Sequence, residues 1–180
     1  MIGSKMRRRL VIDASVAQSA GDSEDEQSSA CRYFLTHVFQ ICHRAVFTKE
    51  LLTEWKNHES TFAKRWRLYM AEEGKFLEDE TAHPVELGNQ IKRLAGSSKK
   101  QSAMEKDAHL LAAAKAADSV VISLDETARR LFAELSRTVK DLRNVTWVNP
   151  NKQSEAPIRW LREGAKNEKS RQLSSFKKYG

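Results

Sequence analysis

The chain has 180 residues, of which 40% are hydrophobic and 31% are charged, as is typical of a soluble globular protein with one domain. No run approaches the roughly 20 apolar residues that span a bilayer, and the N-terminal apolar run is too short for a signal peptide. We therefore expect a cytoplasmic protein without a membrane partner. The net charge of +7 favours polyanionic partners.

The positive charge is concentrated at the two ends of the chain. Arginines occupy residues 7–9, and residues 151–180 hold eight Lys or Arg against three Glu. We expect a compact domain over residues 1–150, followed by a basic helix and tail over residues 151–180. Cys31 and Cys42 share one helical pattern about 16 Å apart, which is too far for a disulfide.

Strand and helix patterns alternate along the sequence. The apolar run Leu10-Val11-Ile12 is typical of a strand covered on both faces. The alternation predicts an α/β fold, a three-layer α/β/α sandwich around a central, mainly parallel sheet. The expected strands are at 9–13, 44–48, 119–124 and 144–148. The expected helices are at 29–43, at 49–72 as one long helix, at 84–95, from after 100 to near 117, at 126–135, and as a short helix within 156–172. Between them we expect a turn at 14–17, an exposed loop at 19–28, a loop at 75–83 and a flexible connector at 96–100, and after them a frayed tail.

Two of the expected strands end in an acid. Asp13 follows the first strand, and Asp125 follows the strand at 119–124. If these strands are parallel neighbours, both acids emerge at the edge of the sheet where ligands bind in open α/β folds. Asp125 is equally suited to cap the next helix. Ser15 could hold a carboxylate or phosphate oxygen at this edge, or only bond the local backbone.

Two further acids lie on expected helices. Asp107 opens the buried stripe of an Ala- and Leu-rich helix, although an acid in the first turns also complements the helix dipole. Glu54 borders the apolar stripe of the helix at 49–72, and Glu50 lies one turn earlier and competes with it. Either glutamate can overhang the edge where Asp13 emerges, and we favour Glu54 because it borders the stripe.

These four acids are the candidate metal ligands. Ligand sets made only of oxygen suit Mg²⁺ or Mn²⁺. Clustered carboxylates repel one another, so the cluster is costly unless a cation neutralises it. A metal centre of this kind binds a phosphate oxygen, activates water and stabilises the departing oxygen. The candidates are Asp13, Glu54, Asp107 and Asp125.

The same segments resemble a PIN domain over about residues 8–148. The similarity is carried by Val11-Ile12-Asp13-Ala14-Ser15, by Leu51-Leu52-Thr53-Glu54-Trp55, by Asp107-Ala108-His109-Leu110-Leu111 with the alanines that follow, and by Ser123-Leu124-Asp125. The resemblance implies a Mg²⁺- or Mn²⁺-dependent endoribonuclease in which the four acids ligate the metal and water attacks. Ser123 would occupy a position where the family often has Thr or Ser. Many small members are toxins of bacterial toxin–antitoxin pairs, which implies an antitoxin protein and a homodimer as partners besides RNA.

Other interpretations fit the residues less well. A phosphatase with an Asp nucleophile after the first strand normally has a second Asp two residues later, and here that position is Ser15. A dinucleotide-binding fold requires a Gly-rich turn after the first strand, and residues 13–17 contain no glycine. The main alternative is an inactive PIN-like module that binds RNA or protein, but it has no reason to keep a repulsive cluster. In the nuclease interpretation, residues 7–9, Lys177 and Lys178 supply phosphate contacts that weaken with salt.

Overall fold

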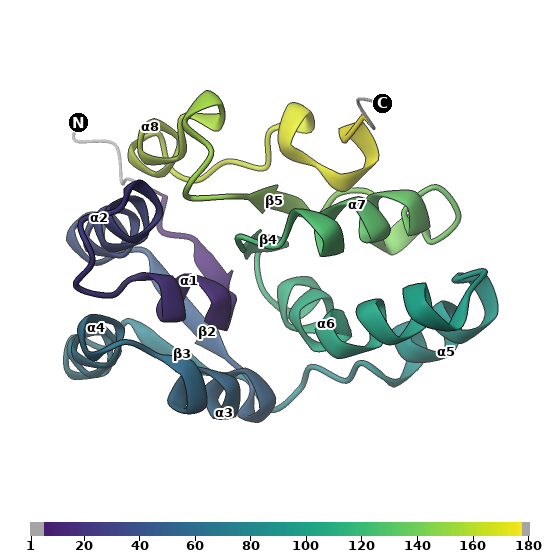
Figure 1. Ribbon diagram of the computed structural model, residues 1–180, viewed down its shortest axis with the longest axis horizontal. Helices are drawn as coiled ribbons and strands as arrows, with labels where there is room; N and C mark the ends of the chain where they lie inside the picture. The colour runs from purple at the N-terminus through teal and green to yellow at the C-terminus, as the bar shows by residue number, and fades with distance from the viewer. Residues whose placement is uncertain (1–5, 178–180) are drawn as a thin grey trace.

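The protein is described by a computed structural model that places residues 6–177 (Figure 1). Strands and helices alternate along the chain. The strands are β1 (Arg9–Ile12), β2 (Arg44–Phe47), β3 (Phe76–Glu78), β4 (Val120–Ile122) and β5 (Thr146–Val148). The α-helices are α1 (Ala14–Ser19), α2 (Glu26–Ile41), α3 (Lys49–His58), α4 (Thr61–Glu72), α5 (Val85–Leu94), α6 (Ser98–Ala116), α7 (Glu126–Leu135) and α8 (Pro157–Arg162). The short 3₁₀ helices are η1 (Lys140–Leu142), η2 (Gln153–Glu155), η3 (Lys169–Arg171) and η4 (Leu173–Ser175).

The five strands form one sheet in the order β3-β2-β1-β4-β5, and every neighbouring pair is parallel. In the central pair, Val11 lies opposite Val121 and Ile12 lies opposite Ile122. The chain leaves β1 towards β2 but leaves β4 towards β5. The gap between the carboxyl ends of β1 and β4 is therefore the topological switch point, where open α/β sheets bind their ligands.

Helices cover both faces of the sheet, so the predicted α/β sandwich with a parallel sheet is confirmed. On one face α2 packs against α4 and α8, and on the other face α6 packs against α5 and α7 (Figure 1). The apolar run of β1 is buried from both sides, and Leu10, Val11 and Ile12 are at most 1% exposed. Their burial explains why this strand carries no polar alternation.

The predicted single helix over residues 49–72 is wrong, because the chain breaks into α3 and α4 at Glu59 and Ser60. Ser60 has an extended backbone, and its Oγ accepts a hydrogen bond from the backbone N–H of Ala63 at 3.0 Å. The same hydroxyl donates to the carbonyl oxygen of Ala20 at 2.6 Å. Ser60 thus caps α4 and ties the break to the end of α1.

Other differences lie in the first half of the chain. The predicted loop at 75–83 contains β3, which pairs with β2 at the edge of the sheet. The predicted turn after Asp13 is the short helix α1. The helix predicted from residue 29 begins at Glu26 instead, because the side chain of Asp25 accepts a hydrogen bond from the backbone N–H of Ser28 at 2.8 Å and caps α2.

The C-terminal segment packs onto the rest of the fold. Helix α8 contacts α2 and ends at Arg162, so it is shorter than the predicted range of 156–172. Trp160 and Leu173 are each 1% exposed, and Gln172 forms an isolated antiparallel bridge with Thr146 of β5. The predicted frayed tail is therefore wrong for residues 173–177, which are anchored through Leu173.

The two cysteines are both free, as their separation predicted. Cys31 is buried on α2, and burial raises the pKa of its thiol to about 12. The thiol therefore stays protonated and packs as a small apolar group. Within residues 6–177, no helix combines the length and the apolar character needed to cross a bilayer.

Candidate carboxylate site

The four predicted acids lie around the carboxyl edge of the sheet. Asp13 directly follows β1, and Asp125 follows β4 after a two-residue extension. These strands are neighbours, so both acids flank the switch point. Asp107 is on α6, which packs against β1 and β4, and Glu54 is on α3, which contacts α6. Four elements that are distant in sequence thus each bring one acid to this edge.

Two serine hydroxyls hold the Asp13 carboxylate. Ser15 donates to Asp13 Oδ2 at 2.5 Å, and the fully buried Ser123 donates to the same oxygen at 2.8 Å. The backbone N–H of Asp13 donates to the carbonyl oxygen of Ile122 at 2.9 Å, which fixes the turn after β1 to β4. Ser15 and Ser123, which were predicted to support the site, therefore orient one of its carboxylates.

Asp107 is a buried carboxyl group without a hydrogen-bond partner among residues 6–177, and it is 8% exposed. Burial is the main cause that raises the pKa of Asp107 to about 7, followed by the charge of Asp13. Lys106 lowers this pKa, whereas Asp125 and Glu54 raise it further. Asp107 is thus within electrostatic reach of the other three acids.

A tryptophan and a histidine position Glu54. The buried Trp55 donates its indole N–H to the carbonyl oxygen of Ile12 at 2.8 Å, which fixes α3 against the end of β1. Glu54 Oε1 lies 3.1 Å from His109 Nε2, two residues beyond Asp107 on α6. His109 is 7% exposed, and its Nδ1 is buried without a hydrogen-bond partner among residues 6–177. His109 was not among the residues predicted for the site.

Glu50, the competitor of Glu54, lines a hollow that His109 also lines. The hollow has a volume of about 350 Å³, lies beside the start of α3 and is also lined by Asp79, Glu80 and His83. Glu54 instead contributes to the raised pKa of Asp107. The geometry thus groups Glu54, rather than Glu50, with the other three acids.

Asp125 also has the structural role that the sequence left open. Its Oδ1 accepts a hydrogen bond from the backbone N–H of Ala128 at 2.8 Å, so it caps α7. Its own backbone N–H donates to Ser123 Oγ at 3.1 Å. Capping occupies one carboxylate oxygen and fixes the side chain at the start of α7.

The donor set fits a hard divalent cation, but the acids do not form a closed cage. Within the part of the chain that the structure describes, no group of three or more His, Cys, Asp or Glu side chains could hold a metal ion as placed. Repulsion between like charges favours such spacing. The oxygen donors match Mg²⁺ or Mn²⁺, and the unpartnered, buried Asp107 marks the negative charge that a cation would neutralise.

The basic ends lie on different sides of the fold. Arg9 is at the amino end of β1, and its guanidinium pairs with Asp118 at 3.0 Å. The length of the strand, about 13 Å, separates it from the edge where Asp13 emerges. Lys177 lines a hollow beside α7, whereas Lys178 is outside the described residues. Arg9 thus lies at the opposite end of β1 from Asp13.

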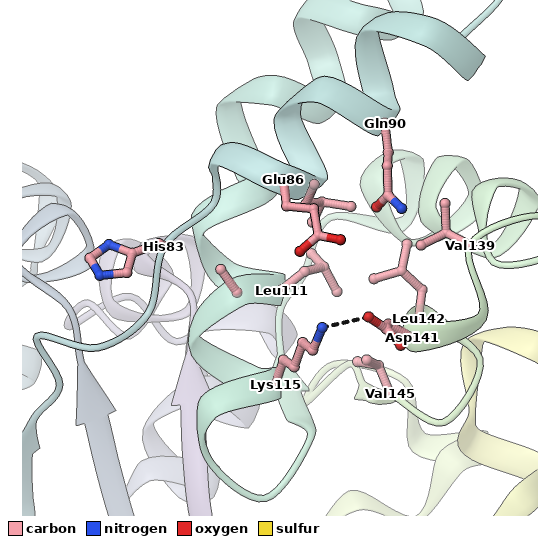
Figure 2. A pocket seen from close by; sticks show the side chains of 11 residues that line it. His83, Glu86, Gln90, Leu111, Lys115, Val139, Asp141, Leu142 and Val145 are labelled. Atoms are coloured by element: carbon pink, nitrogen blue, oxygen red, sulfur yellow. Dashed lines mark hydrogen bonds and ion pairs between the residues drawn. The ribbon is translucent and has the colours of Figure 1, made fainter.

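A small pocket of about 60 Å³ lies between α5, α6 and the segment that follows α7 (Figure 2). Leu111, Leu142 and Val145 contribute apolar walls, and Lys115 forms an ion pair with Asp141 at the opening. The volume suits no more than about two water molecules. This pocket does not include any of the four acids, and it offers no room for a substrate.

The comparisons with known proteins give no match to a family model, a curated protein or a solved structure. An α/β sandwich with a parallel sheet supports many unrelated activities. The function must therefore be argued from the geometry and chemistry of the carboxylate site.

Proposed function

We propose that the protein is a divalent-metal-dependent endoribonuclease of the PIN type. The observation that carries the proposal is the convergence of four acids at the switch point, with Asp107 buried and unpartnered among residues 6–177. A fold gains no stability from uncompensated buried charge, so such a cluster indicates that a cation belongs there. The acids are Asp13, Glu54, Asp107 and Asp125.

Asp13 and the pair of Glu54 and His109 have distinct parts in the proposed reaction. Bound Mg²⁺ or Mn²⁺ would supply charge neutralisation, polarise the phosphate and ease deprotonation of the attacking water. Asp13 offers an oriented carboxylate because Ser15 and Ser123 hold one of its oxygens. Glu54 and His109 form a hydrogen-bonded pair that can accept the proton of the water as its oxygen bonds to phosphorus. The P–O bond to the departing ribose oxygen breaks in the same step, and that oxygen takes up a proton from solvent.

The resemblance to PIN domains extends the proposal to partners. An antitoxin protein and a homodimer are both part of it, as is a cytoplasmic location. The mass of the purified protein in solution tests the homodimer. Co-expression with a candidate antitoxin, followed by the cleavage assay, tests inhibition.

A second candidate function is an inactive RNA-binding module with the same fold. One observation favours it, namely that the acids of residues 6–177 form no group that could hold a metal as placed. Such a module would bind RNA through its basic surface and would leave the strand intact. Cleavage and binding must therefore be measured separately.

The deciding experiment incubates the protein with structured and single-stranded RNA in Mg²⁺, in Mn²⁺ and in chelator. We expect cleavage that requires the ion and falls at least about 100-fold in Asp107→Asn, since metal and proton transfers of this kind contribute factors of this order. Asp22→Asn removes an equal charge from an exposed loop and is the matched control. Cleavage in chelator, or full activity in Asp107→Asn, would overturn the proposal, and binding without cleavage would favour the inactive module.

A further inference from the structure

A hollow of about 960 Å³ lies between the start of α7 and the C-terminal segment. The segment reaches α7 through η4, which packs against it (Figure 1). Five cationic side chains and two glutamates line the hollow, so it carries a surplus of three positive charges. The cations are Arg129, Arg130, Lys152, Arg171 and Lys177.

Arg129 forms a fixed wall of this groove. It is 5% exposed, and its Nη1 binds both Glu126 and Glu155. Its guanidinium lies 4.7 Å from the ring centre of Phe176, and its Nε is buried without a hydrogen-bond partner in the described part of the chain. A buried guanidinium with an unused donor is costly and calls for a further acceptor.

The cations at the rim are differently engaged. Lys152 pairs with Glu126 at 3.1 Å, and Arg171 pairs with Glu168 at 2.7 Å. Arg130 and Lys177 are exposed and take part in neither of these pairs nor in those of Arg129. The acids of the groove thus neutralise its inner wall, and its positive surplus faces solvent.

The groove opens at the same edge of the sheet as the carboxylate site. Glu126 directly follows Asp125 at the carboxyl end of β4, and Lys152 follows the carboxyl end of β5. Because β4 and β5 are parallel neighbours, these ends lie side by side. A chain that occupies the groove can therefore continue across the acids.

The opposite flank of the carboxylate site has the opposite charge. The hollow beside α3 is lined by Glu50, Asp79 and Glu80 with Lys49 as its cation, a surplus of two negative charges. A polyanion is attracted to a positive surface and repelled from a negative one. The charge distribution thus directs a bound polyanion towards α7 and away from α3.

We propose that the groove between α7 and the C-terminal segment binds the sugar–phosphate backbone of the RNA substrate. Arg130 and Lys177 contact phosphates, and Arg129 fixes the wall beneath them. The assignment to RNA rests on the proposed nuclease function. Contacts of this kind position the strand and carry no sequence information.

The test measures binding of a labelled single-stranded RNA by fluorescence anisotropy, in chelator and with Asp107→Asn as the parent chain. The double variant Arg130→Ala/Lys177→Ala should weaken binding roughly 20-fold at 0.1 M salt, and should make the slope of log affinity against log salt shallower by about 1.4. The control Lys64→Ala/Arg65→Ala removes two exposed cations from α4, on the far side of the sheet, and should match the parent. Equal urea midpoints verify that the variants are folded.

Three results would overturn the proposal. They are no binding by the parent, equal losses in the two double variants, or displacement of the RNA by polyglutamate at equal charge concentration. Failure of the groove and failure of the nuclease are distinguishable, because binding is measured without cleavage. RNA binding that needs Arg130 and Lys177 in a protein that never cuts RNA would keep the groove and reject the nuclease. If the protein cleaves RNA and Arg130→Ala/Lys177→Ala binds it with full affinity, the nuclease is kept and the groove is rejected.

Discussion

Replacing Asp107 with Asn should change how the stability of the protein depends on pH. Burial and the charge of Asp13 raise the pKa of Asp107 to about 7, from its ordinary value of 3.8. Between these two values the folded protein holds a proton on Asp107 that the unfolded chain has released. The free energy of unfolding must therefore fall as the pH rises through this window, and it levels off above pH 7.

The magnitude follows from the size of the shift. About three pKa units correspond to about 4 kcal/mol, at 1.36 kcal/mol per unit. Between pH 5 and pH 7 the wild type should lose about 2 kcal/mol through this group alone. Asn resembles the protonated acid in shape and cannot ionise. The free energy of unfolding of Asp107→Asn, relative to that of the wild type, should therefore increase by about this amount between pH 5 and pH 7. The increase is expected although the substitution removes a proposed metal ligand.

Urea unfolding in chelator at pH 5, 6, 7 and 8 measures this difference. Comparing the variant with the wild type cancels other groups, such as His43, whose pKa is lowered first by burial and whose contribution has the opposite sign. Asp22→Asn, in an exposed loop, is the control and should run parallel to the wild type. Added Mg²⁺ or Mn²⁺ should stabilise the wild type most above pH 7, where Asp107 is ionised, and Asp107→Asn far less.

Parallel curves for the wild type and Asp107→Asn would refute the reasoning. They would mean that Asp107 is ionised across the whole pH range. Neither its burial nor its acidic neighbours would then make its ionisation in the folded protein unfavourable. A pH-dependent difference without any stabilisation by Mg²⁺ or Mn²⁺ would have another meaning. That result would support the raised pKa of Asp107, but it would contradict the proposal that Asp107 binds a metal ion.

Two further substitutions test how the site is positioned. Trp55→Phe removes the indole donor to the carbonyl oxygen of Ile12, so urea unfolding should show a loss of about 1–3 kcal/mol, and RNA cleavage should fall with it because α3 loses its anchor. Unchanged cleavage would show that this bond does not position Glu54. Ser60→Ala removes the cap of α4 and should cost about 1 kcal/mol in urea unfolding, with unchanged cleavage per folded molecule. A cost near zero would mean that packing, rather than the cap, defines the break before α4.

The sheet and the grouping of the acids followed from local patterns. Leu10-Val11-Ile12 is apolar without interruption, which already implied a central strand. Once two such strands are parallel neighbours, the residues that follow them must share one edge, and Asp13 and Asp125 do so. The capping role of Asp125 is confirmed, and it leaves the carboxylate close enough for its charge to raise the pKa of Asp107.

The features that were missed depend on contacts between distant residues. The apolar stripe from Trp55 to Trp66 continues with helical spacing across the break, so periodicity alone favours one helix. Ser60 ends that helix partly through Ala20, which lies 40 residues earlier. β3 is only three residues long and is a strand because β2 supplies its partner. His109 could be identified only with its partner Glu54, 55 residues away in sequence.

The carboxylates of the site differ in how they are satisfied, and this difference suggests a division of roles. Asp13 receives two serine hydroxyls, which hold its orientation whether or not a cation is bound. Asp107 receives no hydrogen bond from residues 6–177 and holds its proton to about pH 7. A cation entering the site must displace that proton, so its affinity should weaken about tenfold for each pH unit below 7. Asp13 therefore sets the geometry of the proposed centre, and Asp107 sets the pH above which it can fill.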